Sequence, residues 1–386
     1  MNEPFALTGA RVLLDGRFCD GVSVVVASGR IHQILKDSGL PSDLEKLDLN
    51  GCYLIPGMID LQVNGAAGCM MNVNPTLEGL KDMELQLLRE GTTGFLAAVP
   101  TSSDRMCRKV FRLLHAYRKS ALGNLLGLHM EGPYLNPQSK GAHKARLIRK
   151  ATMDHARWMC QASEGQMRLM TLAPELQDPE ILDYLENQNV SLSLGHSAAS
   201  YLQARDFLLG ALKRPRSVTH LFNAMPSIGH RGEVGPIPAI MELIPFSSVV
   251  ADGHHVAWSV LRLAWKSLGS SLTLVTDRQT VTQGVDCPYY DAGDYFALRG
   301  SDGKGKTLSG AKLTMLEAVR NLHEKVGVPL EQAVKAATLN PARILCMEQR
   351  VGRIAPGLDA DLVAFDSGFH IRKVFFKGVE TALSES

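Results

Sequence analysis

Four side chains that can bind metal or move protons stand at or just beyond the ends of apolar runs: Glu131, His196, His220 and Asp277. Two neutral imidazoles and one carboxylate are typical of a catalytic metal site, because three protein ligands leave one position open for water, whereas a structural site closes that position with protein. We therefore predict that Glu131, His196 and His220 bind one divalent metal ion.

A metal ion held in this way makes its water a stronger acid. The pKa of bound water falls from about 15.7 to about 7, so a nearby carboxylate can remove the proton. We assign this step to Asp277, which then returns the proton to the leaving group. The predicted reaction is hydrolysis at a carbonyl or phosphoryl centre.

The segments that carry these residues belong to a regular alternation of apolar runs and amphipathic stretches from residue 56 onward. Strands separated by helical crossovers are typical of a parallel (β/α)8 TIM-like barrel, whose chemistry lies at the carboxyl ends of the strands. A doubly wound sheet shares the alternation, but no Gly-x-Gly-x-x-Gly motif follows the first strand. The predicted strands are 58–63, 92–99, a run that ends at 131, 168–172, 190–194, 218–222, 248–251 and 272–275, and the main predicted helices are 76–89, 103–119, 152–161, 312–326 and 330–338.

Both ends of the chain are rich in short β-like runs, and neither is long enough to fold alone. We expect them to pair into one small β-sandwich domain beside the barrel, so the fold class is α/β with an added β domain. The predicted boundaries are 1–55 and 351–386 for the small domain and 56–350 for the hydrolase barrel, with 279–306 as an excursion from the barrel; the predicted terminal β runs are 6–14, 22–26, 31–35, 46–55, 351–354, 360–365 and 372–376.

The composition excludes several classes of protein. The formal net charge is +2, which gives no global attraction to nucleic acid or to anionic membranes. The N-terminus has no signal-like segment and no later run approaches the ~18 apolar residues of a membrane span, so we expect a cytoplasmic protein. The seven cysteines are scattered without a Cys-x-x-Cys pair, which favours reduced, structural thiols.

Longer motifs around the candidate residues resemble those of the N-acetylglucosamine-6-phosphate deacetylases of the amidohydrolase superfamily. The resemblance runs from about residue 54 to residue 365, and several of its motifs are long enough to be specific. The matching runs are Pro56–Gly65, His129–Tyr134, Lys140–His143, Thr171–Glu175, Leu194–Ser197, Thr219–Met225, Ala251–Val256, Leu274–Asp277 and Gly352–Leu362.

This resemblance implies hydrolysis of N-acetyl-D-glucosamine 6-phosphate to glucosamine 6-phosphate and acetate. It assigns Glu131, His196 and His220 to the metal and Asp277 to acid–base catalysis. His143 matches the position that polarises the acetamide carbonyl and stabilises the developing oxyanion. The positions that match substrate binding are Gln62, Asn64, Ala142, His143, Asn223, Ala224, Arg231, His255, Leu308, Ser309 and Gly310.

The resemblance also bears on cofactor and assembly. Gln62 and Asn64 stand where many amidohydrolases have His-x-His, and amides bind a borderline-soft metal poorly, so we expect one metal ion per subunit. Zinc is the default expectation, with iron, cobalt and manganese as alternatives. Arg231 and His255 match phosphate contacts. In the family the arginine comes from the neighbouring subunit, so we expect a homodimer that acts on a small sugar phosphate, without nucleic acid or membrane partners.

The chain departs from the family pattern at four places: Arg231–Gly235, Arg278 beside the catalytic aspartate, Gly310–Ala311 and the 279–306 excursion. Alternation along the strand favours an Arg278 side chain that points away from the barrel interior. Two other functions stay open. One is deacetylation of a related amino-sugar phosphate such as N-acetylgalactosamine 6-phosphate, and the other is a catalytically silent binding protein on the same fold.

Overall fold

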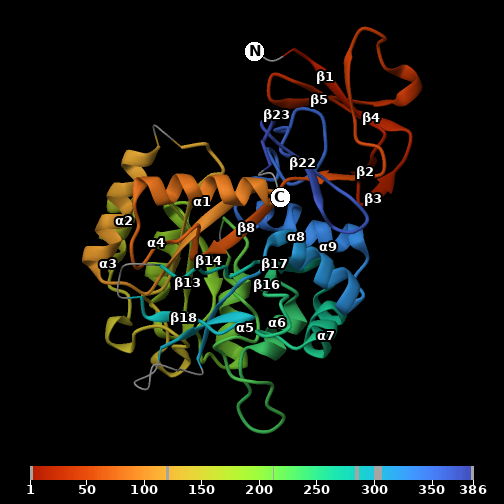
Figure 1. The fold of residues 1–386 in the computed structure, drawn as a ribbon. Helices are drawn as coiled ribbons and strands as arrows, with labels where there is room; N and C mark the ends of the chain where they lie inside the picture. The colour runs from red at the N-terminus through yellow and green to blue at the C-terminus, as the bar shows by residue number, and fades with distance from the viewer. Residues whose placement is uncertain (1–2, 119–120, 212, 283–286, 300–306, 384–386) are drawn as a thin grey trace.

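A computed structural model describes residues 3–118, 121–211, 213–282, 287–299 and 307–383. Its centre is a parallel sheet of eight strands in the order β8-β11-β12-β13-β14-β15-β16-β17, which curls into the barrel seen in the lower left of Figure 1. The sequence therefore predicted the barrel correctly. The strands are β8 (Met58–Val63), β11 (Thr92–Pro100), β12 (Leu125–Glu131), β13 (Met167–Leu172), β14 (Ser191–Leu194), β15 (Ser217–Val218), β16 (Ser247–Val249) and β17 (Leu272–Leu274).

The barrel closes just beyond β17. Val63 and Arg278 form a parallel β-bridge, and the N–H of Asn64 donates to the carbonyl of Arg278 at 2.8 Å. These contacts bring the end of the last strand beside the end of the first. Asp277, which immediately precedes Arg278, is therefore held next to the polar residues that end β8.

Amphipathic helices cover the outside of the barrel, and their starts follow local sequence signals. Thr76, Ser103 and Thr152 each accept a backbone N–H at a helix start, and Thr314 forms a capping box with Glu317. The helices are α1 (Leu77–Arg89), α2 (Asp104–Tyr117), α3 (Met153–Ser163), α4 (Pro179–Asn187), α5 (Tyr201–Leu209), α6 (Ile237–Leu243), α7 (Trp258–Leu268), α8 (Met315–Asn321), α9 (Leu330–Ala337) and α10 (Leu339–Ile344), with a π-helical turn at Leu322–Val326.

The two ends of the chain meet in a β-sandwich, where red N-terminal and dark blue C-terminal strands lie together at the upper right of Figure 1. One sheet has the order β5-β4-β1-β6 and the other the order β23-β22-β21-β7-β2-β3. Leu7 and Val24 of the first sheet share a buried core with Leu54 and Phe375 of the second. The strands are β1 (Phe5–Thr8), β2 (Arg11–Leu14), β3 (Arg17–Cys19), β4 (Val22–Ala27), β5 (Arg30–Lys36), β6 (Glu45–Asp48), β7 (Tyr53–Pro56), β21 (Leu362–Phe365), β22 (Ile371–Phe376) and β23 (Val379–Glu380). The sandwich from both termini is confirmed, while the domain boundaries at residues 55 and 350 stay a prediction.

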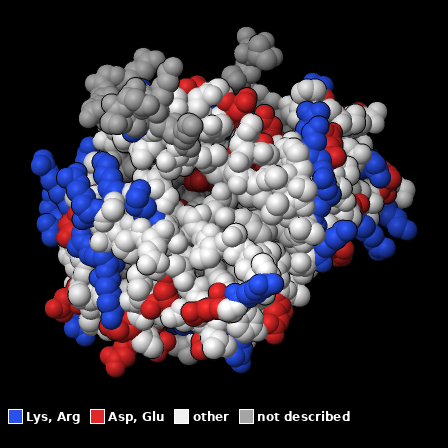
Figure 2. Space-filling view, turned by 90° about the horizontal axis from the view of Figure 1, so that it is seen from below, with Lys and Arg blue, Asp and Glu red and all other residues white. Residues whose placement is uncertain are grey.

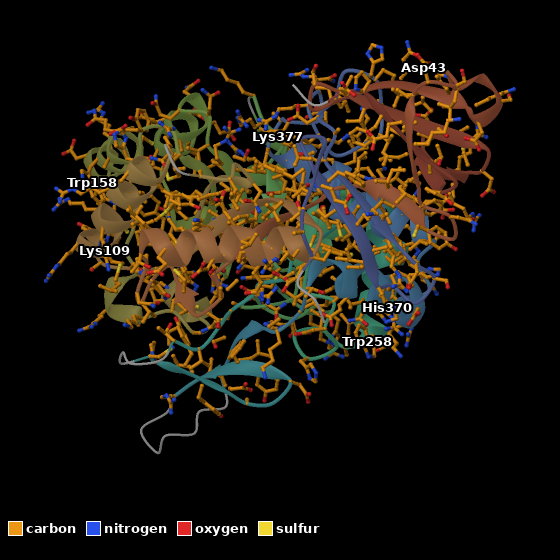
Figure 3. All side chains as sticks on the ribbon, turned by 45° about the horizontal axis from the view of Figure 1, so that its top comes forward. Asp43, Lys109, Trp158, Trp258, His370 and Lys377 are labelled. Atoms are coloured by element: carbon orange, nitrogen blue, oxygen red, sulfur yellow. The ribbon has the colours of Figure 1, made fainter. Side chains whose placement is uncertain are left out.

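The predicted excursion 279–306 contains β18 and β19, which form a three-stranded antiparallel sheet with β20 just after it. The strands are β18 (Tyr289–Asp291), β19 (Tyr295–Leu298) and β20 (Leu308–Ala311), and β18 and β19 lie outside the barrel in Figure 3. Residues 283–286 and 300–306 of the excursion lie outside the described residues. A small hairpin of β9 (Gly65–Ala66) and β10 (Cys69–Met70) follows β8. The sheet and the hairpin both extend the wall of the barrel mouth.

Some predicted element boundaries were wrong. Residues 351–354 are not a strand, because Gly352 has φ +95° and Val351 N–H bonds back to the carbonyl of Met347. The run 218–222 leaves the sheet after Val218, since His220 and Phe222 also have positive φ. Within the described residues, no helix is both long and apolar enough to cross a membrane.

Candidate metal centre and active-site cavity

The three residues predicted to bind a metal come together at the carboxyl end of the barrel. Glu131 ends β12, and His196 and His220 lie two residues beyond β14 and β15. Oε1 of Glu131 lies 3.2 Å from His196 Nε2 and 3.0 Å from His220 Nε2, and the two Nε2 atoms are 3.2 Å apart. These buried ligand atoms all lie within 4.8 Å of one another. The cluster fits a metal site.

A hydrogen bond at the second ring nitrogen of His196 fits the same role. His196 Nδ1 lies 2.9 Å from the carbonyl oxygen of Ser139, so its Nδ1 carries the proton and its Nε2 offers a lone pair. The carbonyl of His196 accepts the N–H of Asn136 at 3.0 Å, which ties the β14 loop to the β12 loop. One nitrogen lone pair of His196 therefore points toward the carboxylate of Glu131.

The backbone at these positions adopts an uncommon conformation. His196, His220 and Asp277 have φ values of 50°, 34° and 51°, which lie in the left-handed region. For residues other than glycine this region costs on the order of 1 kcal/mol or more each, and such strain is concentrated at functional sites. The turn lifts each side chain off the end of its strand and into the barrel mouth.

Asp277 lies beside the cluster and is held by two amides. Its Oδ1 accepts Asn64 Nδ2 at 2.6 Å and Gln62 Nε2 at 3.1 Å, and the same Gln62 nitrogen donates to Glu131 Oε1 at 3.0 Å. Burial and the negative charge of Glu131 raise the pKa of Asp277 well above its ordinary value. A base whose pKa is raised both accepts a proton readily and gives it back.

The pKa of Glu131 is shifted in the opposite direction from that of Asp277. Burial alone would raise the pKa of this carboxyl, but its close contacts with the imidazoles of His143, His196 and His220 outweigh burial and lower the pKa well below the usual range. Glu131 and Asp277 are thus two buried carboxylates with pKa values pushed apart. Such a pair fits a division of roles in which the ionised group binds a ligand and the other transfers protons.

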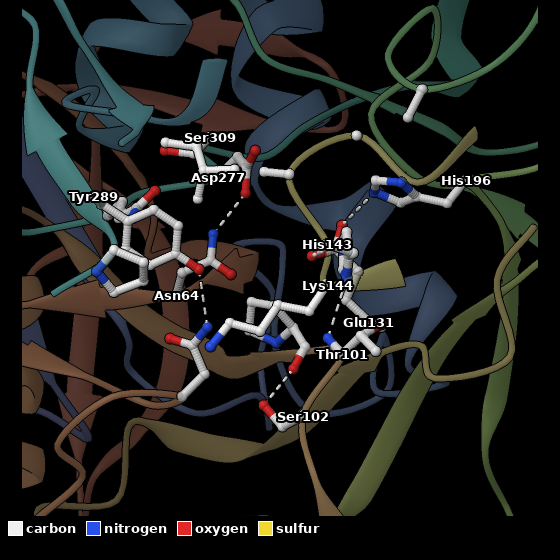
Figure 4. A pocket seen from close by; sticks show the side chains of 18 of the residues that line it. Asn64, Thr101, Ser102, Glu131, His143, Lys144, His196, Asp277, Tyr289 and Ser309 are labelled. Carbon is white, nitrogen blue, oxygen red and sulfur yellow. Dashed lines mark hydrogen bonds and ion pairs between the residues drawn. The ribbon is translucent and has the colours of Figure 1, made fainter. Parts of the chain in front are cut away.

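His143 lies on the loop after β12, close to the cluster. Its Nδ1 accepts the backbone N–H of Thr101 at 3.1 Å, and its Nε2 lies 3.5 Å from Glu131 Oε2. The Nε2 proton is therefore available to a substrate oxygen placed over the cluster. In Figure 4, His143 lies between His196 on one side and Asn64 with Asp277 on the other.

His255, on the loop after β16, forms a buried pair with Asp252. Its Nδ1 lies 2.6 Å from Asp252 Oδ2, and its Nε2 lies 3.7 Å from Asp277 Oδ2. Burial would raise the pKa of Asp252, but the hydrogen bond and charge of His255 lower it. Within the described part of the chain, Nε2 of His255 has no hydrogen-bond partner. It is free to contact a substrate.

These groups line one cavity of about 320 Å³, which is large enough for a small molecule. Figure 2 looks into this hollow, with acidic atoms at its floor and Lys and Arg side chains gathered to its left, where Figure 1 shows α2 and α3. The floor combines the candidate metal cluster with Asp277. The predicted site residues that line the cavity are Asn64, Glu131, Ala142, His143, His196, His220, Asn223, Ala224, His255, Asp277, Leu308 and Ser309.

Three predicted residues lie elsewhere. Gln62 is buried beneath the cavity and acts on Glu131 and Asp277 rather than lining the wall. Gly310 lies behind Asp277, where an added Cβ would be 3.0 Å from the Asp277 carbonyl oxygen. Arg231 is exposed on the loop before α6 and does not line the cavity of its own chain.

Two other histidines at strand ends do not join the site. His129 lies lower in the barrel, where Nδ1 is 2.9 Å from the Leu61 carbonyl oxygen and Nε2 is 2.7 Å from Thr171 Oγ1. Burial lowers the pKa of His129 to about 4, so it is neutral and structural. His254 is exposed and contacts the ring of Tyr295.

The Arg278 side chain points away from Asp277, as the strand alternation predicted. Its guanidinium pairs with the carboxylate of Glu90, at the end of α1. On the barrel side, Asp60 accepts the backbone N–H of Gln62 at 3.0 Å and also bonds the hydroxyl of Thr276, and burial raises the pKa of Asp60 to about 6. Asp60 joins the strand ends that carry Gln62 and Asp277.

Sequence reasoning missed several residues of the cavity wall. Tyr289, Met70 and Met106 come from segments whose path through space is not visible in a one-dimensional pattern. Lys144 and Arg146 follow His143 directly and carried a signal, because two cations beside a candidate catalytic histidine are candidates for contact with an anionic substrate.

Comparison with known proteins places this geometry in context. The model of the amidohydrolase family matches residues 53–381. N-acetylglucosamine-6-phosphate deacetylase from Haemophilus influenzae is 29% identical over 90% of this chain and 92% of its own length. N-acetylgalactosamine-6-phosphate deacetylase from Escherichia coli O157:H7 is 30% identical, over 96% of this chain and 98% of its own.

A solved structure agrees over nearly the whole chain. The crystal structure of N-acetylglucosamine-6-phosphate deacetylase from Pasteurella multocida superimposes with a TM-score of 0.89 at 30% sequence identity, covering 98% of this chain and 100% of the other. The likeness therefore includes both the barrel and the terminal sandwich.

Proposed function

The chain belongs to the amidohydrolase family, and we propose that it hydrolyses the acetamide of N-acetyl-D-glucosamine 6-phosphate to D-glucosamine 6-phosphate and acetate. The observation that carries this proposal is the convergence of Glu131, His196 and His220 beside Asp277 on the floor of one cavity. The retained set of ligands and base argues against a catalytically silent binding protein.

Each protein group has a part in the reaction. A divalent cation held by Glu131, His196 and His220 would acidify water and polarise the amide carbonyl. Asp277 takes a proton from the attacking water and gives it to the leaving nitrogen. His143 donates a hydrogen bond from its Nε2–H to the carbonyl oxygen as negative charge develops there, and keeps its proton. Gln62 and Asn64 hold the Asp277 carboxylate in place through their amide nitrogens.

We propose one metal ion per subunit, with zinc as the default and iron, cobalt or manganese as alternatives. The donor set of two imidazoles and one carboxylate accepts all four ions. The nitrogen of the Gln62 amide faces Glu131 and Asp277, so this side chain presents a hydrogen-bond donor, not a metal-binding oxygen, to the cluster.

Residues on the far side of the cluster fit the sugar phosphate. Asn223 and Ala224 line the wall beyond β15, and His255 presents an unpartnered Nε2 beyond β16. Leu308 and Ser309 line the cavity from β20. We assign these residues, with Ala142 and the neighbouring Gly310 backbone, to substrate binding.

We propose that the working assembly is a homodimer in which Arg231 reaches the partner's phosphate site. Arg231 is exposed and belongs to the segment between β15 and α6, part of which forms the green loop that protrudes at the bottom of Figure 1. Around this loop, α5, α6 and α7 pack side by side and expose Leu202, Ile244 and Leu263. An apolar surface of this kind is typical of a protein interface.

The proposed location is the cytoplasm.

A second candidate substrate is N-acetylgalactosamine 6-phosphate, since the relative from Escherichia coli O157:H7 carries that name. The decisive experiment measures acetate release from both 6-phosphates and from unphosphorylated N-acetylglucosamine, with and without a chelator. We expect the glucosamine 6-phosphate to have the highest kcat/KM and the chelator to abolish turnover. Metal-replete protein that releases no acetate from either phosphate would exclude the proposal.

A further inference from the structure

The cavity extends to both sides of the Glu131, His196 and His220 cluster. In the strand order of the barrel, β11 is the second strand and β15 the sixth, so their ends face each other across the mouth. Of the residues assigned to the sugar phosphate, Asn223 and Ala224 follow β15 and His255 follows β16. The opposite part of the cavity, which we call the second arm, is lined by Met70, Asn72, Ser102, Met106, Tyr289 and Leu298.

The proposed reaction leaves this second arm to the acyl group. The carbonyl carbon must lie over the cluster, with its oxygen toward His143 and its nitrogen toward Asp277. With the sugar beyond β15 and β16, the remaining substituent of the carbonyl carbon points toward β8 and β11. An acetyl group places only a methyl there, and the apolar walls from Met70, Met106 and Leu298 continue past it.

Lys144 brings a positive charge to this side of the cavity. It follows His143, whose ring is fixed by the backbone of Thr101, and in Figure 4 its side chain reaches across the cavity toward Asn64. Lys144 and Arg146 both line the cavity and make no ion pair with a described residue. The acidic residues that line the cavity are Glu131 and Asp277, both on its floor. The wall itself is therefore free of negative charge.

Two further donors lie on the same side. Gln279 is 3% exposed, lines the cavity, and its Nε2 has no hydrogen-bond partner among the described residues. Gln279 packs on Gly310, where an added Cβ would lie 2.5 Å from Gln279 Oε1. The hydroxyl of Tyr289 accepts Asn72 Nδ2 at 3.0 Å, which leaves its own proton free to donate. A buried unpaired amide donor costs free energy until a ligand pairs with it.

We propose that the second arm accepts an acyl group longer than acetyl that ends in a carboxylate, bound by Lys144 and Gln279. The inference rests on the proposed function and names a further class of substrate. These are amino-sugar 6-phosphates whose nitrogen is acylated by one carboxyl group of a dicarboxylic acid. In the reaction the amide C–N bond breaks, the oxygen of water joins the acyl carbon, and a proton from water goes to the nitrogen. The products are the amino-sugar phosphate and the dicarboxylate.

The test compares three synthetic substrates with the metal-replete enzyme: N-acetyl-, N-butanoyl- and N-succinyl-D-glucosamine 6-phosphate. Butanoyl and succinyl have the same chain length and differ in the terminal charge. We expect kcat/KM to be at least tenfold higher for succinyl than for butanoyl. In Lys144→Met this ratio should fall to about one, because a hydrogen-bonded charge pair contributes on the order of 1.5–3 kcal/mol. In Lys109→Met, which removes an exposed lysine of α2 outside the cavity, the ratio should stay at the wild-type value.

The outcomes separate this inference from the proposed function. Acetate release with a succinyl to butanoyl ratio near or below one overturns the inference and leaves the deacetylase standing. Equal losses for all three substrates in Lys144→Met also overturn it, because they assign Lys144 to the phosphate that the substrates share. Failure to hydrolyse any of the three overturns the proposed function and the inference together.

Discussion

The backbone N–H of Thr101 donates to Nδ1 of His143 at 3.1 Å, which leaves the imidazole proton on Nε2, 3.5 Å from Glu131 Oε2. A main-chain donor cannot rotate away, so the tautomer of His143 is set by the fold of the β11 loop. The ring is thereby prepared to donate to a carbonyl oxygen bound over the cluster.

We expect His143→Phe to lower kcat with the metal still bound. Removing one donor to a developing oxyanion costs about 10²–10³-fold in kcat. Steady-state kinetics, with metal analysis of the same preparation, measure both quantities. Because the donor acts mainly in the transition state, KM should change much less than kcat. A variant with kcat within a factor of three of wild type would contradict the assigned role.

Substitutions of Glu131 and of Asp277 should have different effects on metal binding and turnover. Glu131→Gln removes the charged ligand, so the purified variant should lose bound metal and turnover together. Asp277→Asn keeps the ligand set and should retain metal while kcat falls by about 10²–10⁴-fold, the range for loss of a general acid–base group. Mass spectrometry of the metal content beside acetate release distinguishes the two. An Asp277→Asn enzyme with a near-normal rate would refute the assignment of the base.

The sequence could predict this centre because parallel barrel strands bring their carboxyl ends to one face. Apolar runs located Glu131, His196 and His220 at those ends, and their chemistry then indicated a metal. The residue that orients His143 could not be found in the same way, since Thr101 acts through its backbone N–H and any residue type except proline would supply that donor.

Some other residues of the cavity could not be predicted, because their positions depend on the three-dimensional path of the loops. Tyr289 reaches the cavity only because β18 folds back across the barrel mouth, and no periodic pattern encodes that path. The left-handed backbone at His196 and His220 was equally hidden, since histidine gives little sequence signal for positive φ. At His220 it explains why β15 ends at Val218, before the end of the predicted run 218–222.

The Arg278 and Glu90 pair should contribute to stability and leave proton transfer by Asp277 unaffected. The two side chains are 13% and 24% exposed, so Arg278→Ala leaves the partly buried Glu90 carboxylate without its ionic partner, although Gln86 Nε2 still donates to it. We expect a loss of about 1–2 kcal/mol in the free energy of unfolding, between the values for exposed and fully buried pairs. The pH dependence of kcat should match that of wild type. A double-mutant cycle with Glu90→Gln measures the coupling, and a shifted kcat profile would show that Arg278 acts on Asp277 after all.

Asp361 should make the protein less stable as the pH rises from 4 to 6. Burial raises the pKa of Asp361 from 3.8 to about 6, although it accepts the N–H of Lys377 at 2.8 Å. Between these values the folded state binds more protons than the unfolded state, so the free energy of unfolding falls with pH, by up to about 3 kcal/mol in total. Asp361→Asn removes this titration. Its stability relative to wild type, from urea unfolding, should be higher at pH 7.5 than at pH 4.5, and an equal difference at both pH values would contradict the raised pKa.

Arg231 offers a test of the proposed dimer that uses two inactive proteins. Arg231 is exposed and lies outside the cavity of its own chain, so a contribution in trans predicts that it completes the partner's site. We expect Arg231→Ala and Asp277→Asn each to lose most activity as homodimers. The two variants are unfolded, mixed in equal amounts and refolded. In each mixed dimer, one active site carries both substitutions and the other carries neither. Because about half of the dimers are mixed, about a quarter of the wild-type activity should return. Arg231→Ala refolded with itself is the matched control. No recovery in mixtures shown by mass spectrometry to contain mixed dimers would place Arg231 in the site of its own chain, and a monomer by light scattering would exclude the dimer.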